Sequence, residues 1–163
     1  MRVLVVTLAS IALYGAPSEL ANVKAVYFLP MSNGMDQYLA NRIQASDLYV
    51  VTTNPQAADA IFTDTLGPGF ERRMEDLFPS EREEGEKVEQ KRAERLSSFR
   101  KGKGMVFLVD RRTRQVVWST YELPKDASSN NLDRAARRIA DRLRRSLEAR
   151  PGSAARLLSP QSR

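Results

Sequence analysis

Three aspartates at the ends of expected strands are the residues best suited to acid/base chemistry. Asp59 and Asp64 flank an alternating apolar run, and Asp110 follows a later one. Paired carboxylates can act as general acid and base, but such a site needs a complementary acid, base or nucleophile. The chain has no histidine and no cysteine, which removes the usual base near neutral pH, thiol nucleophiles and the commoner zinc ligands. We therefore expect no enzyme activity, no catalytic residue, no cofactor and no metal site.

Each aspartate also has a structural interpretation, which we favour. Asp59 is placed to begin a strand, and Asp110 to begin a turn in which it bonds its own backbone. Asp64 shares a strand side with Phe62 and Leu66, so it is the one we expect to be buried. Gly67-Pro-Gly69 reads as a breaker, because no lysine follows at the spacing of a phosphate-binding loop.

Positive charge is concentrated at the C-terminal end. Residues 134–163 contain nine arginines but only two acidic residues, Asp141 and Glu148. The arginines at 134–145 accompany an apolar stripe with helical spacing, formed by Leu132, Ala135, Ala136, Ile139, Leu143 and Leu147. Planar guanidinium groups suit phosphates and carboxylates. Two interpretations stay open: a solvated face, or a face that binds an anionic partner through Arg134, Arg137, Arg138, Arg144 and Arg145.

The sole tryptophan, Trp118, lies in an expected strand with Val116 and Thr120 on the same side. It could stack on a ligand. A single tryptophan in an alternating strand more commonly packs in the core or at a sheet edge, and we expect that role here.

Residues 1–21 have the layout of a secretory signal peptide. Arg2 is followed by an apolar run from Val3 to Ala16 and then by small residues. As a helix this run would rise only about 21 Å, less than the roughly 30 Å of a bilayer core. Cleavage could fall before Glu19 or before Asn22; the alternative is a buried first strand or helix. We expect a periplasmic or secreted protein without disulfides or a lipid-bearing cysteine.

The remaining pattern predicts one α/β domain over residues 22–148. We expect strands within 23–30, 48–53, 59–66, 105–110 and 115–121, and helices over 32–43, near 70–78, and after Asn130. Ser32 or Asn33 should cap the first helix and Asn130 the last. The order β-α-β-β-α-β-β-α predicts a mixed sheet of about five strands, with parallel early strands, a final hairpin and helices mainly on one face. A charged, flexible arm over 79–103 should interrupt the domain, and 149–163 should form a disordered basic tail.

Three passages resemble a bacterial envelope superfamily. They are Ala58-Asp-Ala-Ile-Phe-Thr-Asp-Thr-Leu-Gly67, the hairpin Leu108-Val-Asp-Arg-Arg-Thr-Arg-Gln-Val-Val-Trp-Ser119, and the alanine- and leucine-rich helix from Leu132 to Leu147. The superfamily includes the periplasmic domain of the curli secretion channel, lipoprotein activators of penicillin-binding proteins and the N-terminal domain of the Tol-system propeller protein. The chain looks most similar to exported bacterial proteins that carry this one domain.

The resemblance implies a non-enzymatic accessory or adaptor protein that contacts another envelope protein. The chain departs from the superfamily's lipoproteins by lacking a cysteine and by its charged arm, so a channel or synthase-activating role is not implied. The alternative from another class is a binder of anionic surfaces, membrane or nucleic acid, through the arginine-rich helix. Export makes nucleic acid the less favoured partner, and no small-molecule substrate is indicated.

Overall fold

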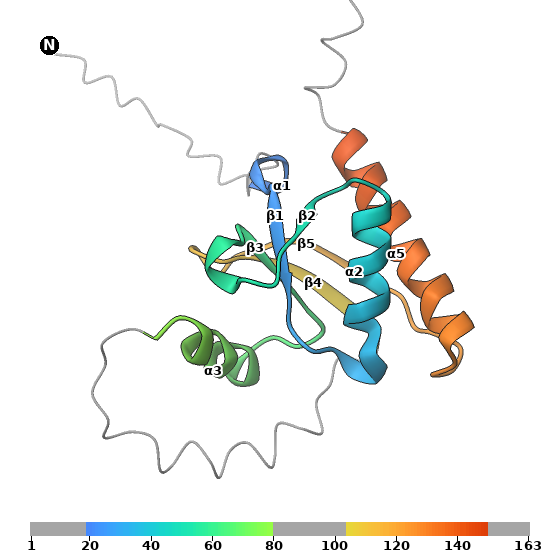
Figure 1. Cartoon of the computed structure of the whole chain (residues 1–163), viewed down its shortest axis with the longest axis horizontal. Coiled ribbons are helices and arrows are strands. Elements are labelled where there is room, and N and C mark those ends of the chain that lie inside the picture. Colours follow the sequence, from blue (N-terminus) through green and yellow to red (C-terminus); the bar gives the residue numbers. More distant parts are fainter. Residues whose placement is uncertain (1–18, 80–103, 150–163) are drawn as a thin grey trace, which may run out of the picture.

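Runs of β-branched and aromatic residues form the strands of a five-stranded sheet in the computed structural model, which describes residues 19–79 and 104–149 (Figure 1). The strands are β1 (Ala25–Phe28), β2 (Val50–Val51), β3 (Ala60–Thr63), β4 (Met105–Asp110) and β5 (Val116–Tyr121). Their order across the sheet is β2-β1-β3-β4-β5, so β2 and β5 are the edges. β1 pairs in parallel with β2 and β3, whereas β4 pairs antiparallel with β3 and β5. The predicted mixed sheet with its final hairpin is confirmed.

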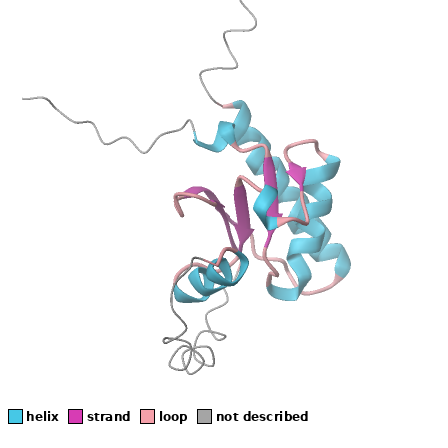
Figure 2. Ribbon diagram, turned by 60° about the vertical axis from the view of Figure 1, so that its left-hand side comes forward, coloured by secondary structure: helices cyan, strands magenta, loops and turns pink. Residues whose placement is uncertain are grey.

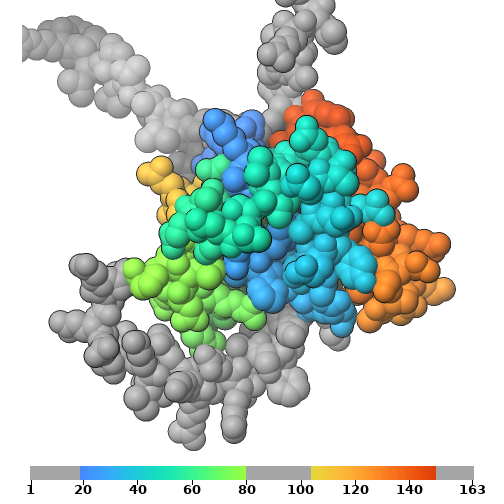
Figure 3. Space-filling model, viewed as in Figure 1, coloured from blue at the N-terminus to red at the C-terminus, as the bar shows by residue number. Residues whose placement is uncertain are grey.

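Four α-helices of the described residues surround this sheet. They are α1 (Glu19–Asn22), α2 (Met35–Ala45), α3 (Pro68–Leu77) and α5 (Ser129–Glu148); two short 3₁₀ helices, η1 (Ser32–Gly34) and η2 (Pro55–Ala57), lie in the connections. α2 and α5 pack side by side on one face of the sheet, while α3 packs against the other face (Figure 2). The space-filling view also shows α2 and α5 side by side (Figure 3). No helix among the described residues is long and apolar enough to span a membrane.

Strand alternation divides the core into two clusters. Val26, Phe62 and Leu108 face α2 and α5, and the ring of Phe62 stacks on Phe28 at 4.7 Å. Ile61 and Val109 point the opposite way, toward α3. The α5 stripe predicted from the sequence is confirmed, because Leu132, Ala135, Ala136, Ile139 and Leu143 are buried and Leu147 packs against them. These contacts fix the faces that α5 and β5 present to solvent.

The predicted helix caps are wrong. α2 begins after Gly34, which has φ 71°, and the hydroxyl of Ser32 bonds Asp64 instead of capping a helix. α5 begins at Ser129 with Ser128 as its N-cap, so Asn130 lies inside the helix. At α2 the distant Asp64 engages Ser32, whereas α5 follows a local turn in which the amide of Ser128 donates to Asp126.

The described fold begins at Glu19. Leu20 of α1 is 2% exposed and belongs to the core beneath α2 and α5. The hydroxyl of Tyr49 donates to the carbonyl oxygen of Leu20 at 3.2 Å. Residues 1–18 of the predicted signal peptide lie outside the described residues, as do 80–103 of the predicted arm and 150–163 of the predicted tail.

Candidate binding face at strand β5 and helix α5

Two of the three aspartates organise backbone where the sequence predicted. Asp59 accepts hydrogen bonds from the amides of Lys24 and Ala25 at 2.9 and 3.0 Å, which ties the start of β3 to β1. Asp110 accepts from the amides of Arg112 and Thr113 at 2.9 and 2.7 Å, which closes the hairpin turn. Both carboxylates therefore have a structural role, because each one holds backbone amides of the fold in place.

Asp64 is buried, as its strand position predicted, with 8% of its surface exposed. It accepts hydrogen bonds from the amide and hydroxyl of Ser32 at 2.8 and 2.7 Å, and from the hydroxyl of Thr65 at 3.0 Å. Asp59 and Asp64 flank opposite ends of β3, so the structure does not bring them together as a catalytic pair.

Two α5 arginines hold the chain that follows β5. Arg138 and Arg142 each place a guanidinium nitrogen 2.8 Å from a carboxylate oxygen of Glu122, which is only 9% exposed. Arg142 also donates to the carbonyl oxygen of Tyr121 at 2.5 Å and to Thr120 Oγ1 at 3.2 Å. We name Glu122, Arg138 and Arg142 the Glu122 clamp. Its single carboxylate is shared by two guanidinium groups, so Arg138, one of the predicted anion-binding residues, is bonded to Glu122 within the fold.

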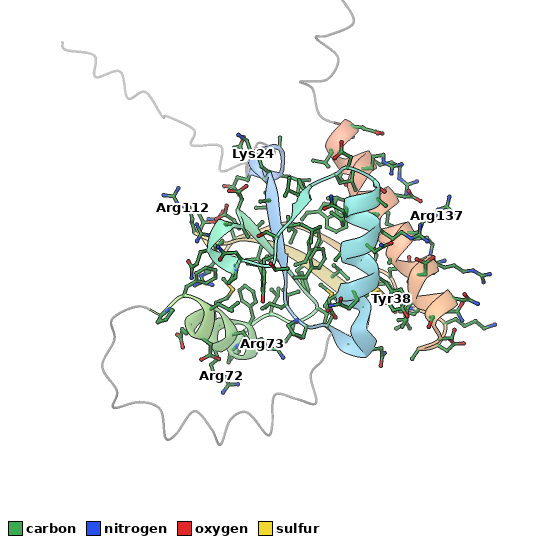
Figure 4. All side chains as sticks on the ribbon, viewed as in Figure 1. Lys24, Tyr38, Arg72, Arg73, Arg112 and Arg137 are labelled. Atoms are coloured by element: carbon green, nitrogen blue, oxygen red, sulfur yellow. The ribbon has the colours of Figure 1, made fainter. Side chains whose placement is uncertain are left out.

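The other predicted arginines differ in their partners. Arg144 lies 3.7 Å from Asp141 one turn earlier. Arg134 and Arg145 are exposed and make no hydrogen bond or ion pair with the part of the chain that the structure describes. Arg137 is exposed and points away from α5 (Figure 4), and its charge helps to lower the pKa of Asp133.

Other cationic side chains lie elsewhere on the molecule. Arg72 and Arg73 project from α3, and Arg112 from the hairpin turn, on the side of the molecule away from Arg137 (Figure 4). The cationic character of α5 is therefore a local stripe and not part of one continuous basic face.

An ion pair between α2 and α5 was not anticipated from the sequence. Arg42 donates through Nε to Asp133 Oδ1 at 2.8 Å, and a second nitrogen bonds the other carboxylate oxygen. This hydrogen bonding lowers the pKa of Asp133 and raises that of Arg42. The residues are separated by 91 positions, so no local spacing could have paired them.

The outer edge of β5 carries unpaired backbone groups. The amide of Glu122 donates to the carbonyl of Gly104 at 2.7 Å. Two residues before Glu122 along the chain, Thr120 is paired with Val106 of β4. Antiparallel pairs alternate, so the amide and carbonyl groups of Ser119 and Tyr121 point away from β4. Of these four outward groups, only the Tyr121 carbonyl has a hydrogen-bond partner among the described residues, and that partner is Arg142.

Exposed apolar side chains gather beside this edge. Val116, Tyr121 and Leu123 are 44%, 56% and 54% exposed, and they make up three of the five large exposed hydrophobic residues in the described chain. The others are Val50 on β2 and Leu66 before α3. A surface that combines open backbone groups with apolar side chains is typical of an interaction site.

A shallow pocket of about 390 Å³ lies between this edge and the end of α5. It is lined by residues 118–120 of β5 and by Arg142, Arg145, Ser146 and Ala149. The indole nitrogen of Trp118 donates to Ser146 Oγ at 3.0 Å, and this hydroxyl donates to the Arg142 carbonyl at 3.0 Å. Trp118 is thus fixed against α5 at the sheet edge, as predicted, and it also forms a wall of the pocket.

Glu122 and the edge position of β5 were not anticipated from the sequence. The i, i+4 spacing of Arg138 and Arg142 put both on one helix side, which is a signal for a shared acidic partner. Nothing local identified Glu122 as that partner. Comparisons with protein-family models, with curated proteins and with solved structures find no match.

Proposed function

We propose that this chain is a non-enzymatic accessory or adaptor protein of the bacterial cell envelope, and that it binds another protein along β5. The observation that carries the proposal is the open β5 edge at Ser119 and Tyr121 with exposed Tyr121 and Leu123 beside it. Proteins usually protect such edges, because an extended segment can pair with them. Strand addition to an open edge is a common mode of protein recognition.

The opposite edge is a weaker candidate. β2 contains only Val50 and Val51, so it offers a short ladder to an incoming strand. β5 contains six residues and borders the pocket and α5. A partner at β5 could therefore gain backbone hydrogen bonds, apolar contact and charge contact together.

Site-specific photo-crosslinking in intact cells tests this proposal. A benzophenone amino acid replaces Tyr121 at the end of β5 or Leu123 just after it in the full chain, and Val50 on the opposite edge strand β2 serves as the exposed apolar control. We expect a discrete crosslink to another protein from positions 121 and 123 and none from position 50. Equal crosslinking from all three positions, or none from β5, would contradict the proposal.

The envelope location is supported by the signal-like pattern of residues 1–21. Fusing residues 1–25 to a reporter that is active only in the periplasm tests it, and an inactive fusion would contradict export. Cleavage before Glu19 would keep Leu20 in the core, whereas cleavage before Asn22 would remove it. We therefore expect the mature protein to begin at Glu19, which N-terminal sequencing can check.

The second candidate function is binding to an anionic surface through the stripe of Arg134, Arg137 and Arg145. The observation that favours it is that these three exposed side chains donate no hydrogen bond to the described chain. Replacing all three with glutamine should weaken salt-dependent binding to anionic vesicles. Arg112→Gln is the control, and binding that the triple replacement leaves unchanged would reject this function. DNA provides a second test surface.

A further inference from the structure

We infer that the guanidinium groups of Arg111 and Arg114, held on the ring of Phe78, bind a phosphate monoester group. The site lies where the turn between β4 and β5 meets the end of α3, apart from the pocket between β5 and α5. It therefore goes beyond the proposed function, which concerns the β5 edge.

Both arginines lie over one aromatic ring. The guanidinium carbon of Arg111 lies 5.3 Å from the centroid of the Phe78 ring, and that of Arg114 lies 5.9 Å from it. Attraction between a cation and the face of an aromatic ring holds such groups in place. Since both carbons lie close to the same ring, a phosphate group beside it can contact both guanidinium groups.

Each of these arginines has one buried nitrogen without a hydrogen-bond partner. Nε of Arg111 and Nη1 of Arg114 are the only buried side-chain nitrogen or oxygen atoms of this kind in the part of the chain that the structure describes. Buried polar atoms nearly always have a partner, so two exceptions at one ring set this place apart. The other guanidinium nitrogens reach solvent. Because the charge is delocalised over the whole group, an anion at those nitrogens also compensates the buried one.

The acidic residues near this turn are bonded elsewhere or unpaired. Asp110 uses its carboxylate on groups of its own turn. Asp59, whose carbonyl oxygen accepts from the amide of Arg111 at 3.0 Å, uses its carboxylate on amides at the start of β1. Neither Glu75 nor Asp76 of α3, nor any other described acidic residue, forms an ion pair with the two arginines. Two cations thus share one ring without a carboxylate from the described fold.

The backbone at Arg114 suits a glycine better than an arginine. Its φ is 61°, and its amide donates to the carbonyl oxygen of Asp110 at 3.0 Å to close the turn. Glycine or asparagine adopts this left-handed conformation at a lower cost. The turn does not need an arginine here for its backbone, which favours a role for the side chain.

Charge selects the ligand. The two guanidinium groups carry two positive charges, because arginine stays protonated in proteins. A phosphate monoester carries about −1.5 to −2 near neutral pH and offers three acceptor oxygens. A carboxylate or a phosphodiester carries a single negative charge and leaves one arginine uncompensated. Inorganic phosphate and a lipid headgroup with a terminal phosphate both present the preferred chemistry.

Isothermal titration calorimetry of the purified protein tests the site. The probes are methyl phosphate, dimethyl phosphate and acetate, compared near neutral pH at constant ionic strength. We expect saturable binding of methyl phosphate at one site per chain, and binding of the other two that is weaker by at least about tenfold, because each has the smaller charge. Equal affinity for all three probes, or no binding of methyl phosphate, would overturn the inference.

Matched variants locate the binding. Arg111→Gln and Arg114→Gln should each weaken methyl phosphate binding by at least about tenfold, because each removes charge-assisted hydrogen bonds. Arg112→Gln is the control: it loses the same charge from the same turn, but Arg112 is exposed at the side of the molecule and has no contact with Phe78 (Figure 4). An equal loss of binding in Arg112→Gln would assign the effect to the general charge of the turn and reject the site.

Two further variants separate binding from a purely structural role. Arg114→Gly suits the positive φ, so it should unfold at a higher temperature than Arg114→Gln and still bind methyl phosphate no better. Phe78→Leu keeps apolar contact but removes the ring, and it should weaken binding. Methyl phosphate binding that follows the thermal stability of the variants, and not the presence of the arginines, would contradict the inference. Circular dichroism checks that each variant is folded.

Vesicles distinguish the source of the phosphate. Phosphatidylcholine vesicles that contain phosphatidic acid present a terminal phosphate, whereas those with phosphatidylglycerol present a phosphodiester. Binding only to the former, lost in Arg111→Gln, assigns a lipid headgroup; binding of methyl phosphate without vesicle binding assigns a soluble phosphate. The glutamine variant of Arg134, Arg137 and Arg145 should keep its affinity for methyl phosphate, and a loss there would reject the site at Phe78. The crosslinking test at β5 is independent of all these results.

Discussion

The carboxylate of Asp64 lies 2.8 Å from the amide nitrogen and 2.7 Å from the hydroxyl oxygen of Ser32, and these bonds join the end of β3 to the segment before α2. Alternation along the strand was enough to predict that Asp64 is buried. Its partner could not be predicted, since Ser32 lies 32 residues earlier and was expected to cap a helix. The buried carboxylate of Asp64 is thus explained by its structural hydrogen bonds to Ser32.

Asp64→Asn should lower the free energy of unfolding by about 1–3 kcal/mol, because an amide group replaces one acceptor oxygen facing the Ser32 donors. Urea denaturation measures the change. Asp110→Asn is a milder comparison, since Asp110 lies in an exposed turn. An Asp64→Asn protein as stable as the wild type would contradict this role.

At the level of elements, the Glu122 clamp joins the end of β5 to α5. Glu122→Ala should cost about 1–2 kcal/mol of unfolding free energy, because Arg138 and Arg142 lose a largely buried acceptor but can reach water. Arg144→Ala, which breaks the longer pair with Asp141, should cost less than about 0.5 kcal/mol. Comparable effects of the two replacements in thermal unfolding would argue against the clamp.

The ion pair between α2 and α5 predicts a pH dependence. The hydrogen bond from Arg42 lowers the pKa of Asp133 below its ordinary value of 3.8. Its stabilisation is therefore complete above about pH 3.8 and is lost as the pH falls toward the lowered pKa of the folded state. The stability difference between the wild type and Asp133→Asn should be largest near neutral pH and shrink below about pH 4. A difference that stays constant to lower pH would contradict the pair.

The presence of the helices could be predicted from the sequence, but the residues at which they begin could not. Apolar spacing located α2, α3 and α5, because burying one face requires that period. The caps were not predictable, since Ser32 bonds the distant Asp64 and α5 begins after Ser128, whose amide donates to Asp126. Where a polar side chain has a distant partner, local capping preference is overridden.

At the scale of the whole molecule, parallel pairing of β1 with β2 followed from the short β-α-β connection. The edge position of β5 did not follow from any local pattern, because β5 resembles an internal strand in its β-branched and aromatic content. Sheet order depends on which faces α2, α3 and α5 cover. The candidate site could therefore be anticipated only in its α5 half, from the arginines.

The buried Leu20 of α1 gives a further prediction. Leu20 is 2% exposed, so Leu20→Ala should destabilise the protein by about 2–3 kcal/mol through lost burial and a partly filled cavity. Chemical denaturation of the purified protein measures this. Replacing the exposed neighbour Ala21 with serine is the control and should change stability little.

The most direct test of the central claim is the crosslink from position 121 in chains that carry Ser119→Pro or Ser119→Ala. Proline removes the outward amide that an added strand needs, whereas alanine keeps it. If the partner adds a strand to β5, the crosslinked partner should disappear with Ser119→Pro and remain with Ser119→Ala, in proteins of equal abundance. The same crosslink in both chains would contradict partner binding by strand addition at β5.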